Sequence, residues 1–298
     1  MQQFLKSVAY WTLPPGVQDS LKGMYRLSSA GNHNSSTTAE VDLIARNNAQ
    51  FRDIHKGERC FILATGPSIN QQDLSVLKNE LCIAVSHFFL HQDIKVINPK
   101  YHVLAPYHPP FNFETIKTVF EGFIKNYSDE MIYFFGHSPY EYSVFNFLKQ
   151  SSFYRLKNTH FINYIDGKVL DEDNYTDDEV WDISRAPFKI RTVIYSAIQL
   201  ALYMGCREIY LIGCDHDYLN DTSRVTNHHF YKEEDGVSDA QHLSSFTTER
   251  WFEEYYLRWK HYRLMREYAR LKNCKIINAT HGGMLDVFPR VELTKIFT

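Results

Sequence analysis

The chain has 298 residues, a length that suits one large domain with appendages or two small domains. Its 44% hydrophobic and 22% charged residues are typical of a globular protein, and a formal net charge of -3 argues against a broad nucleic-acid-binding surface. The five cysteines form no C-x-x-C pair, and no apolar run approaches the roughly 18 residues of a membrane span. We therefore expect a cytoplasmic protein with reduced cysteines.

Residues 1–56 are predicted to form a helical arm and linker that precede a single domain over residues 57–298. The first apolar side chains of the arm recur at helical spacing, at Phe4, Leu5, Val8 and Trp11. This amphipathic helix either lies at a membrane surface as a peripheral contact, or docks on its own domain or on a partner subunit. A polar linker over 31–38 then leads to a second helix, predicted from Ala39 to Ile54.

Apolar runs and amphipathic segments alternate from Cys60 to the end of the chain. The runs predict strands at Cys60–Leu63, Leu81–Val85, Tyr101–Ala105, Met131–Phe135, His160–Asn163, Glu208–Ile212 and Lys275–Asn278. The segments between them predict helices at Glu114–Asn126, Tyr140–Lys149, Phe188–Met204 and Ser245–Lys272. This alternation predicts an α/β fold with a doubly wound, mainly parallel sheet, helices on both faces and ligands at the carboxyl ends of the strands.

The first strand ends in a turn of small residues, Ala64-Thr65-Gly66-Pro67-Ser68. Turn amides and a following helix N-terminus present partial positive charge, which is how α/β proteins hold phosphate groups. Gly66 would let the backbone approach a ligand, Pro67 suits the first turn of a helix, and Ser68 adds a hydroxyl donor. The alternative is an ordinary turn between a strand and a helix, without a ligand.

Acidic and polar residues follow the sixth predicted strand, in Gly213-Cys-Asp-His-Asp217 and Tyr218. Asp215 and Asp217 either bind Mg²⁺ or Mn²⁺, as in the Asp-x-Asp motif of many nucleotide-sugar enzymes, or accept hydrogen bonds from ribose or sugar hydroxyls. His216 is a candidate general base because an imidazole titrates near neutral pH. A solvated turn is the alternative for the whole segment.

Two adjacent histidines, His228 and His229, lie in a long polar loop. Neighbouring side chains point to different sides, so we expect one of the two to act as an acid or base rather than both to bind zinc. Two solvated loop histidines are the alternative. Arg191 and Thr192 begin the predicted helix over 188–204 and are expected to face the same strand ends as Gly66, unless Arg191 is simply solvated.

The last predicted strand runs into a second glycine turn, at residues 278–283. Thr280 and the amides of Gly282 and Gly283 are candidates to hold a phosphate or substrate, in one cleft with Gly66 if the strand order allows. Arg290 follows this turn and either pairs with that phosphate or staples the C-terminal segment to the domain.

Two of these segments, in chain order, resemble segments of bacterial sialyltransferases of the metal-independent, GT-A-like kind. The 64–68 turn is similar to their Gly-Asn-Gly-Pro-Ser turn, with Thr65 in place of the asparagine, and residues 191–215 resemble their helix–Gly–strand–Gly–x–Asp unit. The ending over 278–290 looks more like a related family that includes archaeal 6-hydroxymethylpterin diphosphokinases and motility-associated flagellin glycosyltransferases. The resemblance covers about residues 58–292 and implies a Rossmann-like sheet that binds a nucleotide donor.

This resemblance implies a glycosyltransferase that moves a sugar from a CMP-sugar or similar nucleotide donor to a glycan or lipid-linked acceptor in bacterial surface polysaccharide biosynthesis. The candidate catalytic residues are His216, Asp215, His229 and His281. The candidate donor- and substrate-binding residues are Thr65, Gly66, Pro67, Ser68, Ser86, His87, Arg191, Thr192, Asp217, Tyr218, Thr280, Gly282, Gly283 and Arg290.

Two other functions stay open. A diphosphokinase that transfers pyrophosphate from ATP to a pterin would need Mg²⁺, which Asp215 and Asp217 would hold. A non-catalytic scaffold of a polysaccharide assembly complex would keep the fold without the chemistry. No cofactor is firmly implied beyond a possible role for Mg²⁺ or Mn²⁺.

Overall fold

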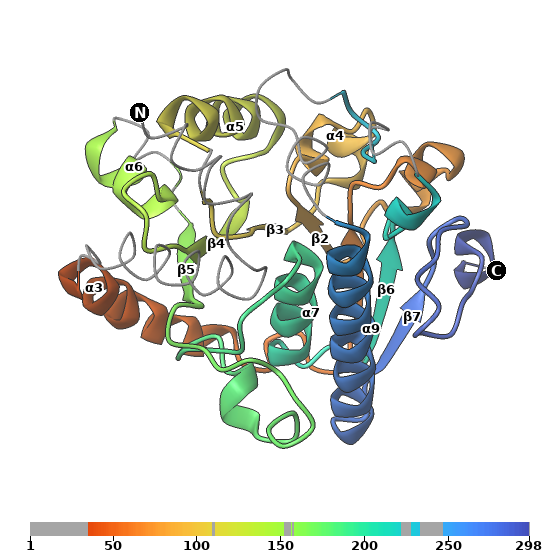
Figure 1. The fold of residues 1–298 in the computed structure, drawn as a ribbon. Coiled ribbons are helices and arrows are strands. Elements are labelled where there is room, and N and C mark those ends of the chain that lie inside the picture. Colours follow the sequence, from red (N-terminus) through yellow and green to blue (C-terminus); the bar gives the residue numbers. More distant parts are fainter. Residues whose placement is uncertain are drawn as a thin grey trace.

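Seven parallel strands form one sheet in the computed structural model, which describes residues 35–108, 111–151, 156, 158–221, 228–232 and 247–297 (Figure 1). Their order across the sheet is β5-β4-β3-β2-β1-β6-β7. The strands are β1 (Arg59–Leu63), β2 (Cys82–Val85), β3 (Tyr101–Leu104), β4 (Ile132–His137), β5 (Thr159–Asn163), β6 (Glu208–Ile212) and β7 (Lys275–Asn278). All strands expected from the apolar runs are confirmed.

Helices connect the strands and lie on both faces of the sheet. The α-helices are α3 (Ser35–Ala45), α4 (Ile94–Ile97), α5 (Phe113–Asn126), α6 (Val144–Gln150), α7 (Val193–Tyr203) and α9 (Thr248–Leu271). Short 3-10 helices are found at Arg46–Phe51, Pro67–Gln71, Leu74–Leu77, Phe88–Leu90, Asp178–Trp181, Tyr218–Asn220 and Leu293–Ile296.

Successive side chains of each strand point to opposite faces of the sheet, so each face has its own hydrophobic core. On β1, Cys60 and Ile62 pack in one cluster with residues of α7 and α9, which lie side by side (Figure 1). Phe61 and Leu63 point to the opposite face and pack with residues of the short helices after β1 and β2. Towards β4 and β5, that opposite face is covered by α5 and α6. The predicted doubly wound α/β architecture is therefore confirmed.

The direction of winding reverses between β1 and β6. The chain adds β2, β3, β4 and β5 on one side of β1 and then returns to place β6 on its other side, paired in parallel from Arg59 with Glu208 to Leu63 with Ile212. The loops after β1 and β6 therefore diverge at the carboxyl edge of the sheet. A reversal of this kind opens a crevice where α/β proteins bind ligands.

Helix α7 begins later than the sequence predicts. Its apolar stripe suggested a start at Phe188, but Thr192 is extended, with φ -148°, and its hydroxyl accepts a hydrogen bond from the Ile194 N–H as an N-cap. Phe188 is fully buried, but it belongs to a segment that is not helical. Similarly, the helix expected over Ala39–Ile54 is divided into α3 and the 3-10 helix Arg46–Phe51.

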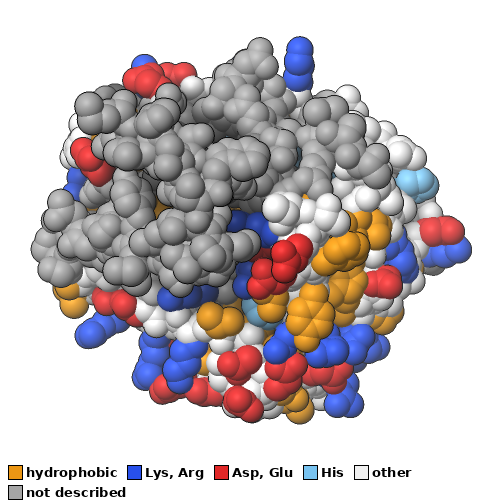
Figure 2. Space-filling model, in the orientation of Figure 1, with side chains coloured by type: hydrophobic (Ala, Val, Ile, Leu, Met, Phe, Trp, Pro, Cys, Tyr) orange, Lys and Arg blue, Asp and Glu red, His pale blue; other side chains and the backbone are white. Residues whose placement is uncertain are grey.

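The predicted N-terminal arm lies largely outside the described residues, because residues 1–34 are not among them. From residue 35 onward, α3 packs against β5 and buries Val41 and Ala45 completely. The domain boundary after residue 56 stays a prediction. Among the described residues, no helix is both long enough and apolar enough to span a membrane. Figure 2 shows basic and acidic side chains intermixed over the lower part of the face that carries α9.

Candidate functional site

A cavity of about 910 Å³ lies at the carboxyl ends of the central strands. The loops after β1, β2 and β6 contribute Thr65 and Gly66, Ser86 and His87, and Asp215 to Tyr218. The start of α7 contributes Arg191 and Thr192. The cavity therefore occupies the crevice at the winding reversal, where the alternation of strands and helices predicted a ligand.

The polar groups of Ser68, in the turn after β1, are hydrogen-bonded to the carboxylate of Asp215. Asp215 Oδ2 accepts a hydrogen bond from the Ser68 N–H at 2.9 Å, and Oδ1 accepts another from the Ser68 hydroxyl. Gly66 makes this approach possible, since a Cβ there would lie 2.6 Å from Asp215 Cγ. The expected phosphate position at Ser68 is thus taken by the Asp215 side chain. Ala64, Thr65 and Gly66 of this turn line the cavity, and Pro67 and Ser68 do not.

Burial of Asp215 raises the pKa of its carboxyl group, and the two hydrogen bonds from Ser68 only partly oppose this effect. A carboxyl group whose pKa is higher in the folded protein stabilises the fold most when it is protonated. That contribution is fully present below the unfolded pKa of about 3.9 and is lost as the pH rises through the folded pKa. Above the folded pKa the ionised, buried carboxylate therefore costs stability.

Asp215→Asn is expected to remove this cost, because its amide can still accept from the Ser68 N–H and donate to the Ser68 hydroxyl. The free energy of unfolding of the wild type should fall relative to that of Asp215→Asn as the pH rises from about 4 through the folded pKa of Asp215. Asp215→Ala leaves Ser68 without its partner and should cost about 1–3 kcal/mol. Urea unfolding of the three proteins across this pH range tests the assignment, and parallel pH profiles for wild type and Asp215→Asn would contradict it.

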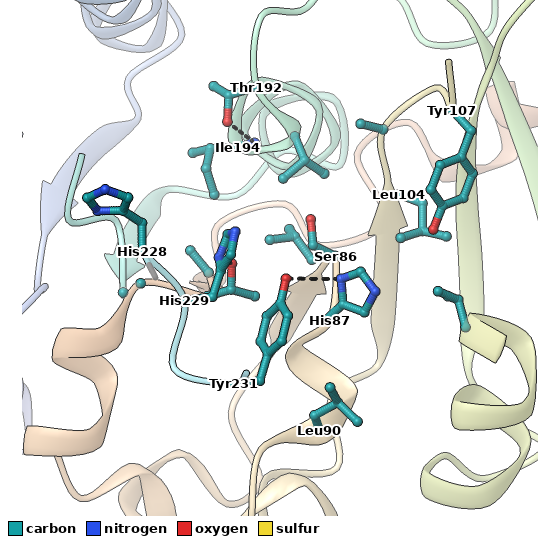
Figure 3. Close-up of a pocket in the computed structure, with 18 of the residues that line it drawn as sticks. Ser86, His87, Leu90, Leu104, Tyr107, Thr192, Ile194, His228, His229 and Tyr231 are labelled. Carbon is teal, nitrogen blue, oxygen red and sulfur yellow. Dashed lines mark hydrogen bonds between the residues drawn. The ribbon is translucent and has the colours of Figure 1, made fainter. Parts of the chain in front are cut away.

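A short segment, residues 228–232, crosses the end of β1 and brings two aromatic side chains into the cavity (Figure 3). The Phe230 N–H donates to the Thr65 carbonyl at 2.9 Å, which anchors the segment. His229 Nδ1 lies 2.9 Å from Thr65 Oγ1, and its ring stacks on Tyr231. The Tyr231 hydroxyl lies 3.1 Å from His87 Nδ1. The structure thus joins the candidates Thr65, His87 and His229 in one polar cluster.

His228 occupies a different position from its neighbour. Its Nδ1 lies 3.4 Å from Asp217 Oδ1, and its Nε2 lies 3.6 Å from Asp221 Oδ2. Asp217 is therefore engaged by His228, while Asp215 is engaged by Ser68. The described residues contain no group of three or more His, Cys, Asp or Glu side chains arranged to hold a metal ion.

His216 borders the cavity, but its imidazole packs under α9. Its Nε2 lies 2.7 Å from the Tyr262 hydroxyl, and burial together with the charge of Arg258 lowers its pKa to about 3. A histidine with this pKa is neutral at physiological pH and is a much weaker base than an ordinary imidazole. Its backbone is left-handed, with φ +49°, which turns the side chain towards Tyr262.

The second glycine turn lines another cavity. Thr280, His281, Gly282 and Arg290 surround a cavity of about 610 Å³ that is separate from the first. Arg290 donates to the backbone carbonyls of Leu285, Thr280 and Gly282, so its guanidinium holds the turn in place. The expectation of a single cleft was wrong, because the 280–283 turn packs behind Asp215 instead of facing the cavity at Gly66.

Thr280 and Gly283 contribute to the support of Asp215. The Thr280 hydroxyl accepts from the Cys214 N–H at 3.0 Å. A Cβ on Gly283 would lie 2.7 Å from the Asp215 carbonyl oxygen, so only glycine fits this approach. Whether Thr280, Gly282, Gly283 and Arg290 contact a substrate stays a prediction.

Arginines from α9 and from the residues just before α7 complete one wall of the cavity. Arg191 is exposed, as in the alternative interpretation, and it also pairs with Glu254 at 2.9 Å. Arg258 also lines the cavity, and the sequence analysis missed it. A basic residue within a long charged helix carries no local signal of function, because its direction is fixed only when α9 docks against α7.

The sequence matches a known protein family over more than half of its length. The 6-hydroxymethylpterin diphosphokinase MptE-like family matches residues 34–221, and no curated protein matches the chain. The fold is similar to that of the MAf glycosyltransferase from Magnetospirillum magneticum AMB-1, with 12% identity, 86% of this chain covered and a TM-score of 0.46. This chain spans only 38% of the length of that protein.

A second similar structure is the sialyltransferase CstII from Campylobacter jejuni in complex with the substrate analogue CMP-3FNeuAc. The identity is 15%, the TM-score is 0.42, and the match covers 78% of this chain and 86% of CstII. At these values the two structures illustrate the fold and nothing more. The match over residues 34–221, more than half of the sequence, shows that the chain belongs to the 6-hydroxymethylpterin diphosphokinase MptE-like family.

Proposed function

We propose that this chain is a glycosyltransferase that moves a sugar from a nucleotide-activated donor to a hydroxyl acceptor. The supporting observation is the cluster of Thr65, His87, His229 and Tyr231 inside a cavity at the winding reversal of the sheet. A cavity of about 910 Å³ is large enough for a nucleotide sugar. Hydroxyl and imidazole groups at its wall provide donors and acceptors for sugar and ribose hydroxyls.

In the proposed transfer, His229 accepts the proton of the acceptor hydroxyl while the acceptor oxygen bonds to the anomeric carbon of the sugar. The bond between that carbon and the donor phosphate breaks, and its electron pair leaves with the nucleotide. The Thr65 hydroxyl, 2.9 Å from His229 Nδ1, fixes the orientation of the ring. Cations at the cavity wall offset the charge that develops on the leaving phosphate.

The cavity extends from this cluster towards α5, where apolar and aromatic side chains form part of its wall (Figure 3). This part is lined by Leu90, Leu104, Tyr107 and Phe111. Aromatic rings next to hydroxyl groups suit the apolar face of a sugar ring. We assign this part of the cavity to the acceptor, a glycan or lipid-linked sugar of surface polysaccharide assembly. The proposed membrane contact falls on residues outside the described part and stays a prediction.

Family membership favours a second candidate, the transfer of pyrophosphate from ATP to a pterin. In that reaction, Mg²⁺ on the ATP phosphates would meet Asp217 rather than Asp215, whose carboxylate is held by Ser68. Product analysis separates the two candidates. Formation of AMP and a pterin diphosphate from ATP supports the second, whereas release of a nucleotide from a sugar donor supports the first.

Thermal unfolding in the presence of CMP, UDP, GDP and ATP tests the proposed site directly. A ligand at about 100 times its Kd adds roughly 2.7 kcal/mol to the stability of the folded protein. For a domain of this size we expect one nucleotide class to raise the melting temperature by about 5 °C or more. If no nucleotide or nucleotide sugar raises the melting temperature, the proposed function is wrong.

A further inference from the structure

One cationic side chain in the cavity, Arg258 of α9, has no anionic partner in the described part of the chain. Its Nε is buried and has no hydrogen-bond partner, and the guanidinium forms no ion pair within the parts of the chain that the structure describes. Its nearest aromatic contact is the Tyr255 ring, 5.6 Å from the guanidinium carbon to the ring centroid. Arg258 is half-buried at the cavity wall, and a buried donor without a partner is costly, so its Nε requires an explanation.

Three carboxylates of the cavity wall, those of Glu254, Asp215 and Asp217, already have partners. Glu254, one helical turn before Arg258, pairs with Arg191 at 2.9 Å. Asp215 accepts from Ser68, and Asp217 lies against His228. His216, beside Arg258, adds no negative charge because a histidine is either neutral or positive. Among the described residues, Arg258 therefore has no ion-pair partner.

The first turn of α7 adds to the positive potential at Arg258. The Tyr195 hydroxyl donates to the Arg258 carbonyl at 2.9 Å, which places the start of α7 beside this part of α9. Arg191, Thr192 and Val193 line the same cavity as Arg258, so the N-terminal end of α7 opens on it. The N-terminus of a helix carries partial positive charge and favours anions. Two guanidinium groups and a helix N-terminus thus lie at this wall of the cavity, where the Glu254 carboxylate pairs with Arg191.

We infer that Arg258 and the first turn of α7 form the subsite for the phosphate groups of the nucleotide. This inference rests on the proposed function and deepens it. It moves the phosphates away from the Gly66–Ser68 turn, where the Asp215 carboxylate already satisfies the Ser68 amide and hydroxyl. A guanidinium is suited to this task because its fork of N–H donors matches two phosphate oxygens.

The test compares Arg258→Met with Arg263→Met, a matched change on the outer face of the same helix. Arg263 is 54% exposed and pairs with Glu172 at 3.4 Å. Calorimetric titration with inorganic pyrophosphate and with nucleoside diphosphates measures the Kd of each variant. We expect Arg258→Met to raise both Kd values by about 10–100-fold, the usual effect of losing a charge-assisted hydrogen bond. Arg263→Met should leave both unchanged, and Arg258→Lys should lie between.

The melting temperature of the unliganded variants provides a second readout. Removing a half-buried guanidinium whose Nε has no hydrogen-bond partner should keep or raise the melting temperature of Arg258→Met, whereas a purely structural arginine would lower it. Equal pyrophosphate and nucleotide affinities in wild type, Arg258→Met and Arg258→Lys would overturn the inference. Pyrophosphate binding that depends on Arg258, without binding of any nucleotide, would overturn the proposed function and leave this subsite in place.

Discussion

His229→Ala is expected to lower kcat for sugar transfer by about 10²–10⁴-fold, the contribution of a positioned general base. The residue is held in the cavity by Thr65 Oγ1 at 2.9 Å from its Nδ1 and by stacking of its ring on Tyr231 at a centroid distance of 4.9 Å. Its side chain is not part of the buried core, so the variant should fold. Steady-state kinetics with the donor found by thermal unfolding provides the measurement.

His281→Ala is the matched control for this experiment, because His281 is an exposed histidine at the second cavity. Its kcat should stay near that of the wild type. Thr65→Val, which removes the hydroxyl that orients the ring, should lower kcat by less than His229→Ala. A His229→Ala variant with wild-type kcat would show that another group accepts the proton, and an inactive His281→Ala would return attention to the second cavity.

Gly66→Ala is expected to destabilise the domain and to abolish nucleotide binding. The added methyl group would lie 2.5 Å from the Gly213 carbonyl oxygen and 2.6 Å from Asp215 Cγ. Gly66 has φ -63°, which alanine adopts without strain, so the effect comes from crowding alone. Overpacking of this kind costs about 1–3 kcal/mol. It would also displace the loops after β1 and β6 that line the cavity.

Gly282→Ala separates crowding from backbone strain. Gly282 has φ +67°, and a Cβ there would meet no atom within 4 Å. Its replacement should cost about 1 kcal/mol through the left-handed backbone and leave nucleotide affinity unchanged. Urea unfolding and nucleotide titration of both variants are the measurements. If Gly66→Ala binds nucleotide as tightly as Gly282→Ala, the loops after β1 and β6 do not form the donor site.

The strands could be predicted from sequence because local features determine them. Buried parallel strands are short apolar runs, and each one here ends at small or polar residues, as β1 does at Thr65 and Gly66. The start of α7 was placed too early because Phe188 continues the apolar pattern of the helix without being helical. An apolar residue at such a position fits both a helix and a buried extended segment. Only the N-cap at Thr192 distinguishes the two in the structure.

The candidate site could be predicted only in part. The sequence located the strand ends that form it, and Thr65, His87 and His229 do meet there. The sequence analysis predicted that the Ser68 amide binds a ligand. Its actual partner, Asp215, lies 147 residues further along the chain, so no local pattern reveals the contact. Arg258 was missed for the same reason: its exposure to the cavity depends on the packing of α9 against α7. Contacts between distant segments decide which polar groups remain available to a ligand.

A crystal structure of the protein with the nucleotide that stabilises it most tests the central claim most directly. We predict that the nucleotide lies in the cavity between the β1 and β2 loops and α9, with its phosphates at Arg258 and its sugar end near His229. A nucleotide bound in the second cavity, at His281 and Arg290, would contradict this account.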